Sequence, residues 1–160
     1  MSDAAGRFAD AAAAAGLAPD VRRFPEGTRT AEDAARAIGC DVGQIVKSLV
    51  FVAGSEPVLA LTSGKNRVDQ AKLAALCVAS DARKATADEV RTATGYAIGG
   101  TPPFGHPGRL RCFADPDLME FDMVWAAAGT PDSIFPIAPE QLMRVAGAQV
   151  APFTETRPAR

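Results

Sequence analysis

Apolar residues along this chain follow two spacings, and each spacing predicts a different kind of element. Segments in which apolar residues recur every three to four positions, between a capping residue and a glycine, predict helices. Such segments cover residues 2–15, 30–39, 66–77, 86–95 and 139–147. Thr30 precedes Asp33 by three positions, which is the spacing of a capping box. Thr86 and Glu89 repeat this spacing, and Asn66 is the expected cap of the third helix.

Shorter apolar and β-branched segments, bounded by glycine or polar residues, predict strands. Residues 44–54 and 56–64 are the strongest of these, and the short turn between them predicts a hairpin of two largely buried strands. Further short strands are expected at residues 21–24, 96–98, 110–113, 123–127, 134–137 and 149–153. A hairpin mixed with isolated helices predicts one α/β domain of the mixed α+β kind over residues 1–160, rather than a doubly wound parallel sheet.

Composition narrows the class of protein. With 160 residues, of which 48% are hydrophobic and 22% charged, the chain has the size and balance of one globular domain. No apolar run approaches the roughly 20 residues that span a bilayer. Asp3, Arg7 and Asp10 interrupt the alanine-rich start, which predicts a surface helix rather than a signal peptide. We therefore expect a cytoplasmic protein without a membrane partner.

The net charge of −2 is unevenly distributed along the chain. Residues 36–111 hold ten Lys or Arg and six Asp or Glu, a local charge of +4, whereas residues 112–140 hold six acids and no base. This pattern is compatible with a basic face that binds a polyanion such as RNA. The other interpretation, which charge alone favours, is an ordinary surface of scattered ion pairs. DNA is not an expected partner.

Several common catalytic machineries lack their residues in this sequence. Cys40, Cys77 and Cys112 are widely spaced and form no CxxC pair, which argues against a disulfide framework and a zinc site. His106 is the only histidine, and the sequence contains neither GxSxG nor a phosphate-binding glycine motif. We therefore expect no metal, no cofactor and no triad of the Ser-His-Asp kind.

Lys47 lies inside the apolar segment QIVKSLVF, on the same predicted face as Ile45 and Leu49. An ammonium among apolar neighbours is costly unless it has a partner or a function. One interpretation is a charge on an edge strand that prevents aggregation. The other is a lysine that projects into a pocket and holds an anionic or carbonyl group.

The segment GGTPPFGHPG, residues 99–108, combines four glycines with three prolines. Glycine permits positive φ and a close approach of a ligand to the backbone, and proline holds a loop in one shape. The segment is either a proline-stiffened turn between strands or a rigid wall whose backbone N–H and C=O groups face a substrate. As an oxyanion site, one fixed donor contributes about 3–4 kcal/mol to an acyl-transfer step.

The order and separation of several motifs resemble those of one family. The motifs are QIVKSLVF, PVLALTSGKNRVDQAKLA, ADEVRTATGYAIGGTPPFG and DPDLMEFDMVWAAAGTPDSIFPIAPEQLMRVAGAQVAPF. Over residues 30–153 the chain resembles the YbaK/EbsC, or ProX-type, family of free-standing aminoacyl-tRNA deacylases. These proteins are relatives of the editing domain of bacterial prolyl-tRNA synthetase. Residues 1–28 would add an N-terminal helix and a short strand to this family core.

The resemblance implies a mostly antiparallel mixed sheet, barrel-like and flanked by helices, and hydrolysis of the ester that joins a wrong amino acid to tRNA. It places Lys47, Gly100 and Gly105 in the catalytic machinery, with water as the attacking group, helped by a terminal tRNA hydroxyl or by the loop backbone. The residues to which it gives substrate contact are Gly99, Pro103, Phe104, Ala128, Gly129 and Asp132. The implied partners are the acceptor end of an aminoacyl-tRNA and prolyl-tRNA synthetase.

The residues leave some roles open. Asp132 fits either a ligand for the substrate amine or the cap of a turn. Ser48 stands where several alanine-clearing relatives have Asn, and alanine precedes Gly129 where some relatives have a hydroxyl residue. The leading hypothesis is a trans-editing deacylase for tRNA-Pro that carries a small amino acid such as Ala or Cys. The alternatives are a non-catalytic module that docks on tRNA or a synthetase, and a pocket protein that holds a carboxylate with Lys47.

Overall fold

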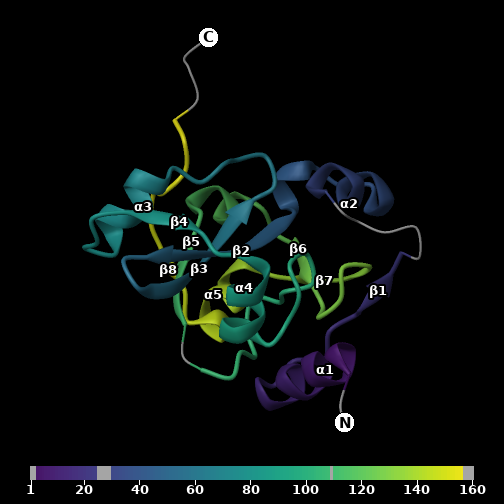
Figure 1. Cartoon of the computed structure of the whole chain (residues 1–160). Helices are drawn as coiled ribbons and strands as arrows, with labels where there is room; N and C mark the ends of the chain where they lie inside the picture. The colour runs from purple at the N-terminus through teal and green to yellow at the C-terminus, as the bar shows by residue number, and fades with distance from the viewer. Residues whose placement is uncertain (1–2, 25–29, 109, 157–160) are drawn as a thin grey trace.

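The structure, a computed structural model, describes residues 3–24, 30–108 and 110–156 of the chain (Figure 1). The helices in these ranges are α1 (Ala4–Ala14), α2 (Ala31–Ile38), α3 (Gln70–Leu76), α4 (Ala87–Thr94) and α5 (Pro139–Ala146). The strands are β1 (Arg22–Arg23), β2 (Val46–Ala53), β3 (Glu56–Ser63), β4 (Ala82–Lys84), β5 (Arg111–Ala114), β6 (Val124–Ala127), β7 (Ser133–Ile137) and β8 (Gln149–Val150). Two short 3-10 helices are also present, η1 (Val42–Gln44) before β2 and η2 (Pro116–Glu120) after β5.

The described strands form two sheets. The larger sheet has the order β4-β2-β3-β5-β8, with antiparallel pairs around β2 and parallel pairs around β5. The smaller sheet, in the order β1-β7-β6, is antiparallel. An isolated parallel bridge between Ile45 and Trp125 joins the two sheets. The expected mixed and mostly antiparallel α/β architecture is therefore confirmed, although the described strands form two joined sheets rather than a closed barrel.

The central hairpin follows directly from the apolar pattern. β2 and β3 pair over their whole length, from Val46 opposite Ser63 to Ala53 opposite Glu56. Gly54 turns the chain with a φ of +65°, a conformation that glycine adopts without steric cost. Because β2 is antiparallel to β3 and β3 is parallel to β5, the first residues of β2 and the last residues of β3 and β5 lie at the same end of the sheet.

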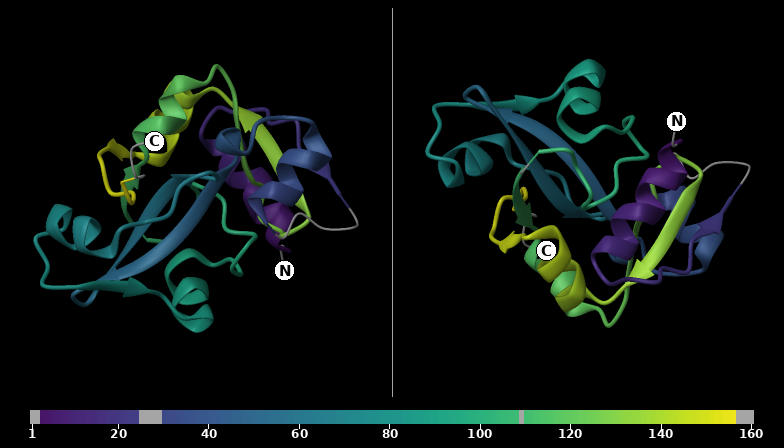
Figure 2. Two further views of the ribbon diagram at one scale, coloured as in Figure 1. Left: turned by 90° about the horizontal axis from the view of Figure 1, so that it is seen from above. Right: turned by 90° about the horizontal axis from the view of Figure 1, so that it is seen from below.

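The two sheets share one apolar core, and α1 belongs to it. Phe8 of α1 is 1% exposed, and its ring centre lies 5.5 Å from that of Phe104 and 4.9 Å from that of Phe135 in β7. Figure 2 shows α1 alongside β7 in both views. A second apolar cluster joins Phe51 and Phe113 to the buried side of α3. The N-terminal helix therefore packs one face into the core, while Arg7, Ala9 and Asp10 on its other side remain exposed, as expected of a surface helix.

The third helix begins later than the sequence pattern predicted, and one predicted strand is absent from the described residues. Asn66 does not cap the third helix, because α3 begins at Gln70 and the Asp69 side chain accepts hydrogen bonds from the backbone of Ala71 and Lys72. Residues 96–98, expected as a strand, instead lead into a turn over residues 97–100, in which the Gly100 N–H donates to the Ala97 oxygen at 3.0 Å. The reason is that α4 ends on Gly95 in the left-handed conformation, which redirects the chain.

The smallest strands are where pattern and structure differ most. β4 was not expected, because two of its three residues are exposed cations and carry no apolar alternation. Its place in the sheet comes from pairing with residues 51–53 of β2. The expected strand at 149–153 is shortened to β8, and Phe153 is instead buried beside α3.

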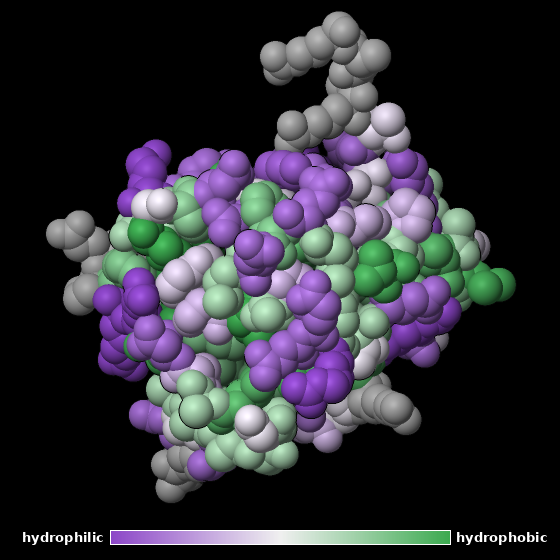
Figure 3. Space-filling view, turned by 180° about the vertical axis from the view of Figure 1, so that it is seen from behind, coloured by the Kyte–Doolittle hydropathy of each residue, from purple (hydrophilic) through white to green (hydrophobic). Residues whose placement is uncertain are grey.

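The molecular surface mixes hydrophilic and hydrophobic residues on the face opposite that of Figure 1 (Figure 3). Large apolar side chains that are exposed among the described residues are Val21, Val78, Ile98, Met123 and Val150. Within the described ranges, no helix combines the length and the apolarity that a bilayer crossing requires. Of the exposed apolar side chains, Ile98 lines the cavity that forms the candidate site.

Candidate active site

A cavity of about 500 Å³ lies where the two sheets meet. Residues 46–51 of β2 form one wall, and residues of β6 and β7, among them Trp125 and Ser133, form another. The helices and loops around it, together with the last residue of β4, contribute Ala31, Glu32, Ala34, Lys84, Ala85, Val90, Ile98, Gly99 and Thr101. The volume falls in the range of small-molecule sites, and most of the lining side chains are apolar.

On the side of β2 that faces away from β3, backbone pairing occurs only near the two ends of the strand. The cavity lies beside the unpaired residues between those ends. β4 pairs only with residues 51–53, and the bridge to β6 lies at Ile45. The Ala85 N–H donates to the Val50 backbone oxygen at 3.1 Å, so Val50 turns its backbone groups to this edge. Backbone direction alternates along a strand, so Ser48 faces the same edge.

Ser48 is a polar residue of the site to which the sequence analysis gave no binding role. Its hydroxyl oxygen is buried and has no hydrogen-bond partner within the residues that the structure describes. A hydroxyl inside an otherwise apolar strand was the available signal. Ser48 lies at the middle of the unpaired edge, and its backbone N–H and C=O groups face that edge.

The Lys47 side chain is half-buried and lines the cavity. Its Nζ donates a hydrogen bond of 2.6 Å to the backbone oxygen of Asn66, and it forms no ion pair with any described residue. Burial lowers the pKa of Lys47 below its ordinary value of 10.5. The cations Arg67 and Lys84 act in the same direction, while nearby carboxylates oppose the shift. Lys47 therefore lines a pocket, as the interpretation of a ligand-holding lysine requires.

Charged groups of both signs surround the cavity. Those among the described lining residues are Lys47, Lys84 and Glu32, and Arg67 is near enough to affect the charge on Lys47. Asp115 also acts on the charge of Lys47, so three cations stand against two carboxylates, a balance that favours an anionic or carbonyl oxygen near Lys47. Glu32 is suited to a cationic group of a ligand, such as an ammonium.

The glycine-rich loop contributes its first half to the cavity. Gly99, with a φ of +88°, and Thr101 line it. Gly100 is buried against the turn between β6 and β7, where a Cβ would lie 2.9 Å from the Cα of Thr130. A side chain cannot fit at this distance, so glycine at position 100 allows the loop and the turn to approach each other.

The second half of the same loop faces α1. Pro103 is buried, and Phe104 is 5% exposed with its ring packed among other core phenylalanines. Gly105 has a φ of +83°, and a Cβ there would lie 2.5 Å from the Cβ of Ala11. These three loop residues are outside the described lining of the cavity, and they fix the loop to the N-terminal helix.

The turn between β6 and β7 holds the remaining residues to which the sequence analysis gave substrate contact. Ala128 is 2% exposed in the core, and Gly129, with a φ of +103°, leaves no room for a Cβ beside a backbone oxygen of α1. Asp132 accepts a 2.6 Å hydrogen bond from the Thr130 hydroxyl, and this bond lowers the pKa of Asp132. As placed, these residues shape the turn, and Ser133, the next residue, reaches the cavity.

The histidine and the buried thiol lie apart from the cavity. His106 Nε2 is 2.9 Å from the Pro102 backbone oxygen, and burial lowers the pKa of this imidazole. Burial also raises the pKa of the Cys112 thiol to about 12. In the described part of the chain, no group of three His, Cys, Asp or Glu side chains is arranged to hold a metal ion. The described cavity lining thus contains neither an imidazole nor a thiol.

Comparison with known protein sequences adds a relationship to this geometry. The model of the aminoacyl-tRNA editing domain matches residues 25–145. The chain is 31% identical over 132 residues to the uncharacterized protein YwhH of Bacillus subtilis (strain 168), a match that covers 82% of this chain and 83% of that protein. It is 37% identical over 99 residues to the proline–tRNA ligase of Nitratidesulfovibrio vulgaris (strain DP4). The latter match covers 62% of this chain but 17% of the ligase.

A solved structure extends the likeness over the whole described fold. The crystal structure of a candidate trans-editing enzyme for prolyl tRNA synthetase has a TM-score of 0.91 and 46% sequence identity. The match covers 98% of this chain and 99% of that one. Coverage of this extent takes in α1, which precedes the residues matched by the editing-domain model.

Proposed function

The chain belongs to the aminoacyl-tRNA editing domain family, and from this premise we propose that it is a trans-editing aminoacyl-tRNA deacylase. Such an enzyme hydrolyses the ester between a wrong amino acid and its tRNA. The observation that carries the proposal is Lys47, a half-buried cation in a largely apolar cavity of about 500 Å³ beside a glycine-bearing loop. Aminoacyl-tRNA as substrate places the reaction in the cytoplasm.

The proposed reaction uses water as the nucleophile. Neither a thiol nor an imidazole is present in the described lining, so catalysis rests on positioning and on backbone electrostatics. Water attacks the ester carbonyl, and the bond between the carbonyl carbon and the ribose oxygen breaks. The amino acid leaves as a carboxylic acid, and the terminal hydroxyl of the tRNA regains its proton.

The loop supplies backbone groups to the developing oxyanion. The Gly100 N–H is already bonded to the Ala97 oxygen at 3.0 Å, so we assign the donor role to the neighbouring N–H groups of Gly99 and Thr101. One such donor is worth about 3–4 kcal/mol in an acyl-transfer step. In this proposal Gly100 acts by permitting the close approach of the loops, and Gly105 acts by fixing the loop to α1.

Lys47 is the proposed anchor for an oxygen of the substrate. Its ammonium has three N–H donors, and one is used by Asn66, which leaves two for the terminal phosphate or the ester carbonyl. Glu32 is the proposed partner of the α-ammonium of the amino acid. Five further residues lie outside the described lining, and we propose that they support the residues that form the cavity walls. They are Pro103, Phe104, Ala128, Gly129 and Asp132.

The proposed substrate is tRNA-Pro charged with a small non-cognate amino acid such as Ala or Cys. The support is the relationship to proline–tRNA ligases and to a candidate trans-editing enzyme for prolyl tRNA synthetase. A cavity of this size accommodates an amino acid with the terminal ribose. Selection between side chains that differ by one methylene is worth only about 1–3 kcal/mol in an apolar pocket.

A deacylation panel tests the proposal. tRNA-Pro is charged separately with Ala, Cys, Ser, Thr and the cognate Pro, and release of the amino acid is followed in time. We expect at least one non-cognate ester to be hydrolysed faster than Pro-tRNA-Pro, because a trans-editing enzyme has to spare the correctly charged tRNA. Binding of tRNA without hydrolysis of any ester would instead support a non-catalytic module that docks on tRNA or on prolyl-tRNA synthetase.

A further inference from the structure

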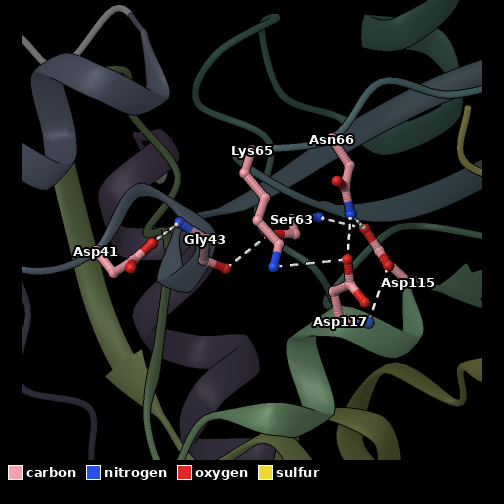
Figure 4. Close-up of polar contacts among 7 residues, drawn as sticks. All are labelled: Asp41, Gly43, Ser63, Lys65, Asn66, Asp115 and Asp117. Carbon is pink, nitrogen blue, oxygen red and sulfur yellow. Dashed lines mark hydrogen bonds and ion pairs between the residues drawn. The ribbon is translucent and has the colours of Figure 1, made fainter. Parts of the chain in front are cut away.

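A polar network joins the residues that follow β3 to those that follow β5 (Figure 4). It lies at the end of the sheet where β2 begins, and it reaches Lys47 through Asn66. Its centre is Asp115, which follows β5 and is 1% exposed. One carboxylate oxygen accepts from the Ser63 N–H at 3.0 Å and from Asn66 Nδ2 at 2.8 Å, and the other accepts from the Asp117 N–H at 2.9 Å. These donors offset the cost of burying a carboxylate, and they fix the turn after β3 to the start of η2.

Asn66 connects this network to the cavity. Its Nδ2 donates to Asp115 and also, at 2.8 Å, to Asp117, while its backbone oxygen accepts the 2.6 Å bond from Lys47. The residue is 7% exposed, and Lys65 Nζ lies 3.7 Å from the Asp117 carboxylate that holds it. Hydrogen bonds to two carboxylates therefore fix the side chain of Asn66. The backbone oxygen of the same residue sets the position of the Lys47 ammonium.

Ser63 and Gly64, which precede Asn66, pack tightly against residues 42–45, the segment before β2. The Gly64 N–H donates to the Ile45 backbone oxygen at 2.7 Å, and a Cβ on Gly64 would collide with the backbone oxygen of Val42. The Ser63 hydroxyl donates to the Gly43 backbone oxygen at 2.8 Å. The carbonyl that meets Lys47 thus belongs to a turn held from two sides.

Asn66 also separates the ammonium from the carboxylates. Lys47 forms no ion pair with a described residue, although Asp115 is near enough to influence its charge. The side-chain amide of Asn66 donates to both carboxylates, while the backbone oxygen of the same residue gives the lysine a neutral acceptor. The ammonium keeps its charge and two N–H donors for an incoming oxygen, whereas a lysine paired directly with a carboxylate would first have to break that pair.

We propose that Asn66, held by Asp115 and Asp117, is a positioning residue for Lys47. It places the ammonium at the cavity and keeps the buried carboxylate of Asp115 from neutralising it. This inference rests on the proposed function, in which Lys47 contacts the substrate. The sequence pattern indicated a helix cap at Asn66, because the side chains that hold this residue lie far along the chain, 49 and 51 positions away.

Asn66→Ala tests the inference, because it removes both amide donors and leaves the backbone carbonyl in the chain. We expect kcat/KM for the best-hydrolysed misacylated tRNA to fall on the order of 100-fold, the cost of misplacing a reacting group by about 1 Å. In ¹⁵N-labelled protein the hydrogen-bonded Lys47 ammonium should give a resolved ¹H–¹⁵N signal. In Asn66→Ala this signal should disappear, because the ammonium then exchanges rapidly with water.

Asp69→Ala is the matched control. Asp69 caps α3 in the same connecting segment but makes no bond to the network. It should lower the melting temperature while leaving the Lys47 signal in place and kcat/KM within about threefold of wild type, because a lost cap reduces stability without moving Lys47. Asn66→Ser, which keeps one donor, replaces Asn66→Ala if the latter does not fold, and it should show a smaller loss of the same kind.

Two results would overturn the inference. In one, Asn66→Ala keeps the Lys47 signal and its activity. In the other, Asp69→Ala loses as much activity as Asn66→Ala, since general loosening would then explain both. A wild-type protein that hydrolyses no misacylated tRNA would instead refute the proposed function, and the Lys47 signal in Asn66→Ala would still decide whether Asn66 positions the lysine.

Discussion

Lys47 is a charged residue that the fold holds at some expense of stability. Burial lowers its pKa, so between this lowered pKa and 10.5 the folded chain binds fewer protons than the unfolded chain. Stability contributed by this site therefore rises with pH through that window. The arrangement is expected where a cation is retained for binding, and it is the reverse of what a stabilising ion pair would give.

Lys47→Met separates the two roles of this side chain, because it keeps an unbranched chain and removes the charge. We expect the variant to be at least as stable as wild type at pH 7 and to lose the site's rise in stability toward pH 10, since no ammonium then has to be buried. Urea unfolding of both proteins across this pH range measures the difference. A variant clearly less stable than wild type at pH 7 would contradict the idea that the charge is kept for function.

Gly100 tests whether the approach of two loops matters. A Cβ would lie 2.9 Å from the Cα of Thr130, so even alanine must push the loop away from the turn between β6 and β7. We expect Gly100→Ala to lower deacylation by more than about 10-fold and the free energy of unfolding by about 1–3 kcal/mol, with unfolding still cooperative. Gly108→Ala is the control, because a Cβ at that position meets nothing within 4 Å. Equal activity of the two variants would show that the contact is unimportant.

At the residue scale, the sequence indicated those features that stand out from their immediate neighbours. Lys47 was identified because a charge interrupts an apolar strand, and the loop because glycines and prolines cluster in it. Asn66 was misassigned, because its decisive partners come from another strand end. The placement of Phe104 in the core depends on α1, which lies far from it in the sequence.

At the element scale, the elements specified by local chemistry were predicted. The Thr30 hydroxyl accepts from the Asp33 N–H at 3.0 Å, and Thr86 with Glu89 forms the complete capping box. The hairpin of β2 and β3 needed only two adjacent apolar runs. β4 and η2 were not predicted, because a short charged strand and an irregular turn take their shape from the partners that they meet.

The helix α1 packs against the glycine-rich loop through Ala11 and Gly105. One pair of substitutions tests whether this contact stabilises the loop. We expect Gly105→Ala to lower the free energy of unfolding by about 1–3 kcal/mol, because a Cβ would lie 2.5 Å from the Cβ of Ala11 and the φ of +83° disfavours a side chain. Ala11→Gly alone should cost about 1 kcal/mol of helix propensity.

Combining the two substitutions relieves the steric part of the loss. The double variant should therefore be more stable than the sum of the single losses by about 0.5 kcal/mol or more, the coupling expected of residues in contact. Urea unfolding of the four proteins gives the coupling free energy directly. Strictly additive losses would show that α1 does not brace the loop through this contact.

At the scale of the whole molecule, the cavity is a consequence of how two sheets join. Ile45, just before β2, is bridged to Trp125 of β6, and β2 is paired with β4 from residue 51 onward. The unpaired part of β2 between these two points forms a wall of the cavity. Apolar patterning predicted both strands but could not predict this gap, because it depends on which strand ends meet. The resemblance of ordered motifs indicated the family, and the matched editing-domain model confirmed it.

The most direct test of the central claim is the single-turnover rate of hydrolysis of the best misacylated tRNA-Pro by Lys47→Ala. Lys72→Ala is the matched control, because Lys72 Nζ binds the Thr154 oxygen and the Thr156 hydroxyl and is not among the described lining residues. If Lys47 anchors the substrate, its removal lowers the rate on the order of 100-fold or more, while Lys72→Ala stays within about threefold of wild type. A Lys47→Ala variant that hydrolyses the ester at the wild-type rate would contradict the account.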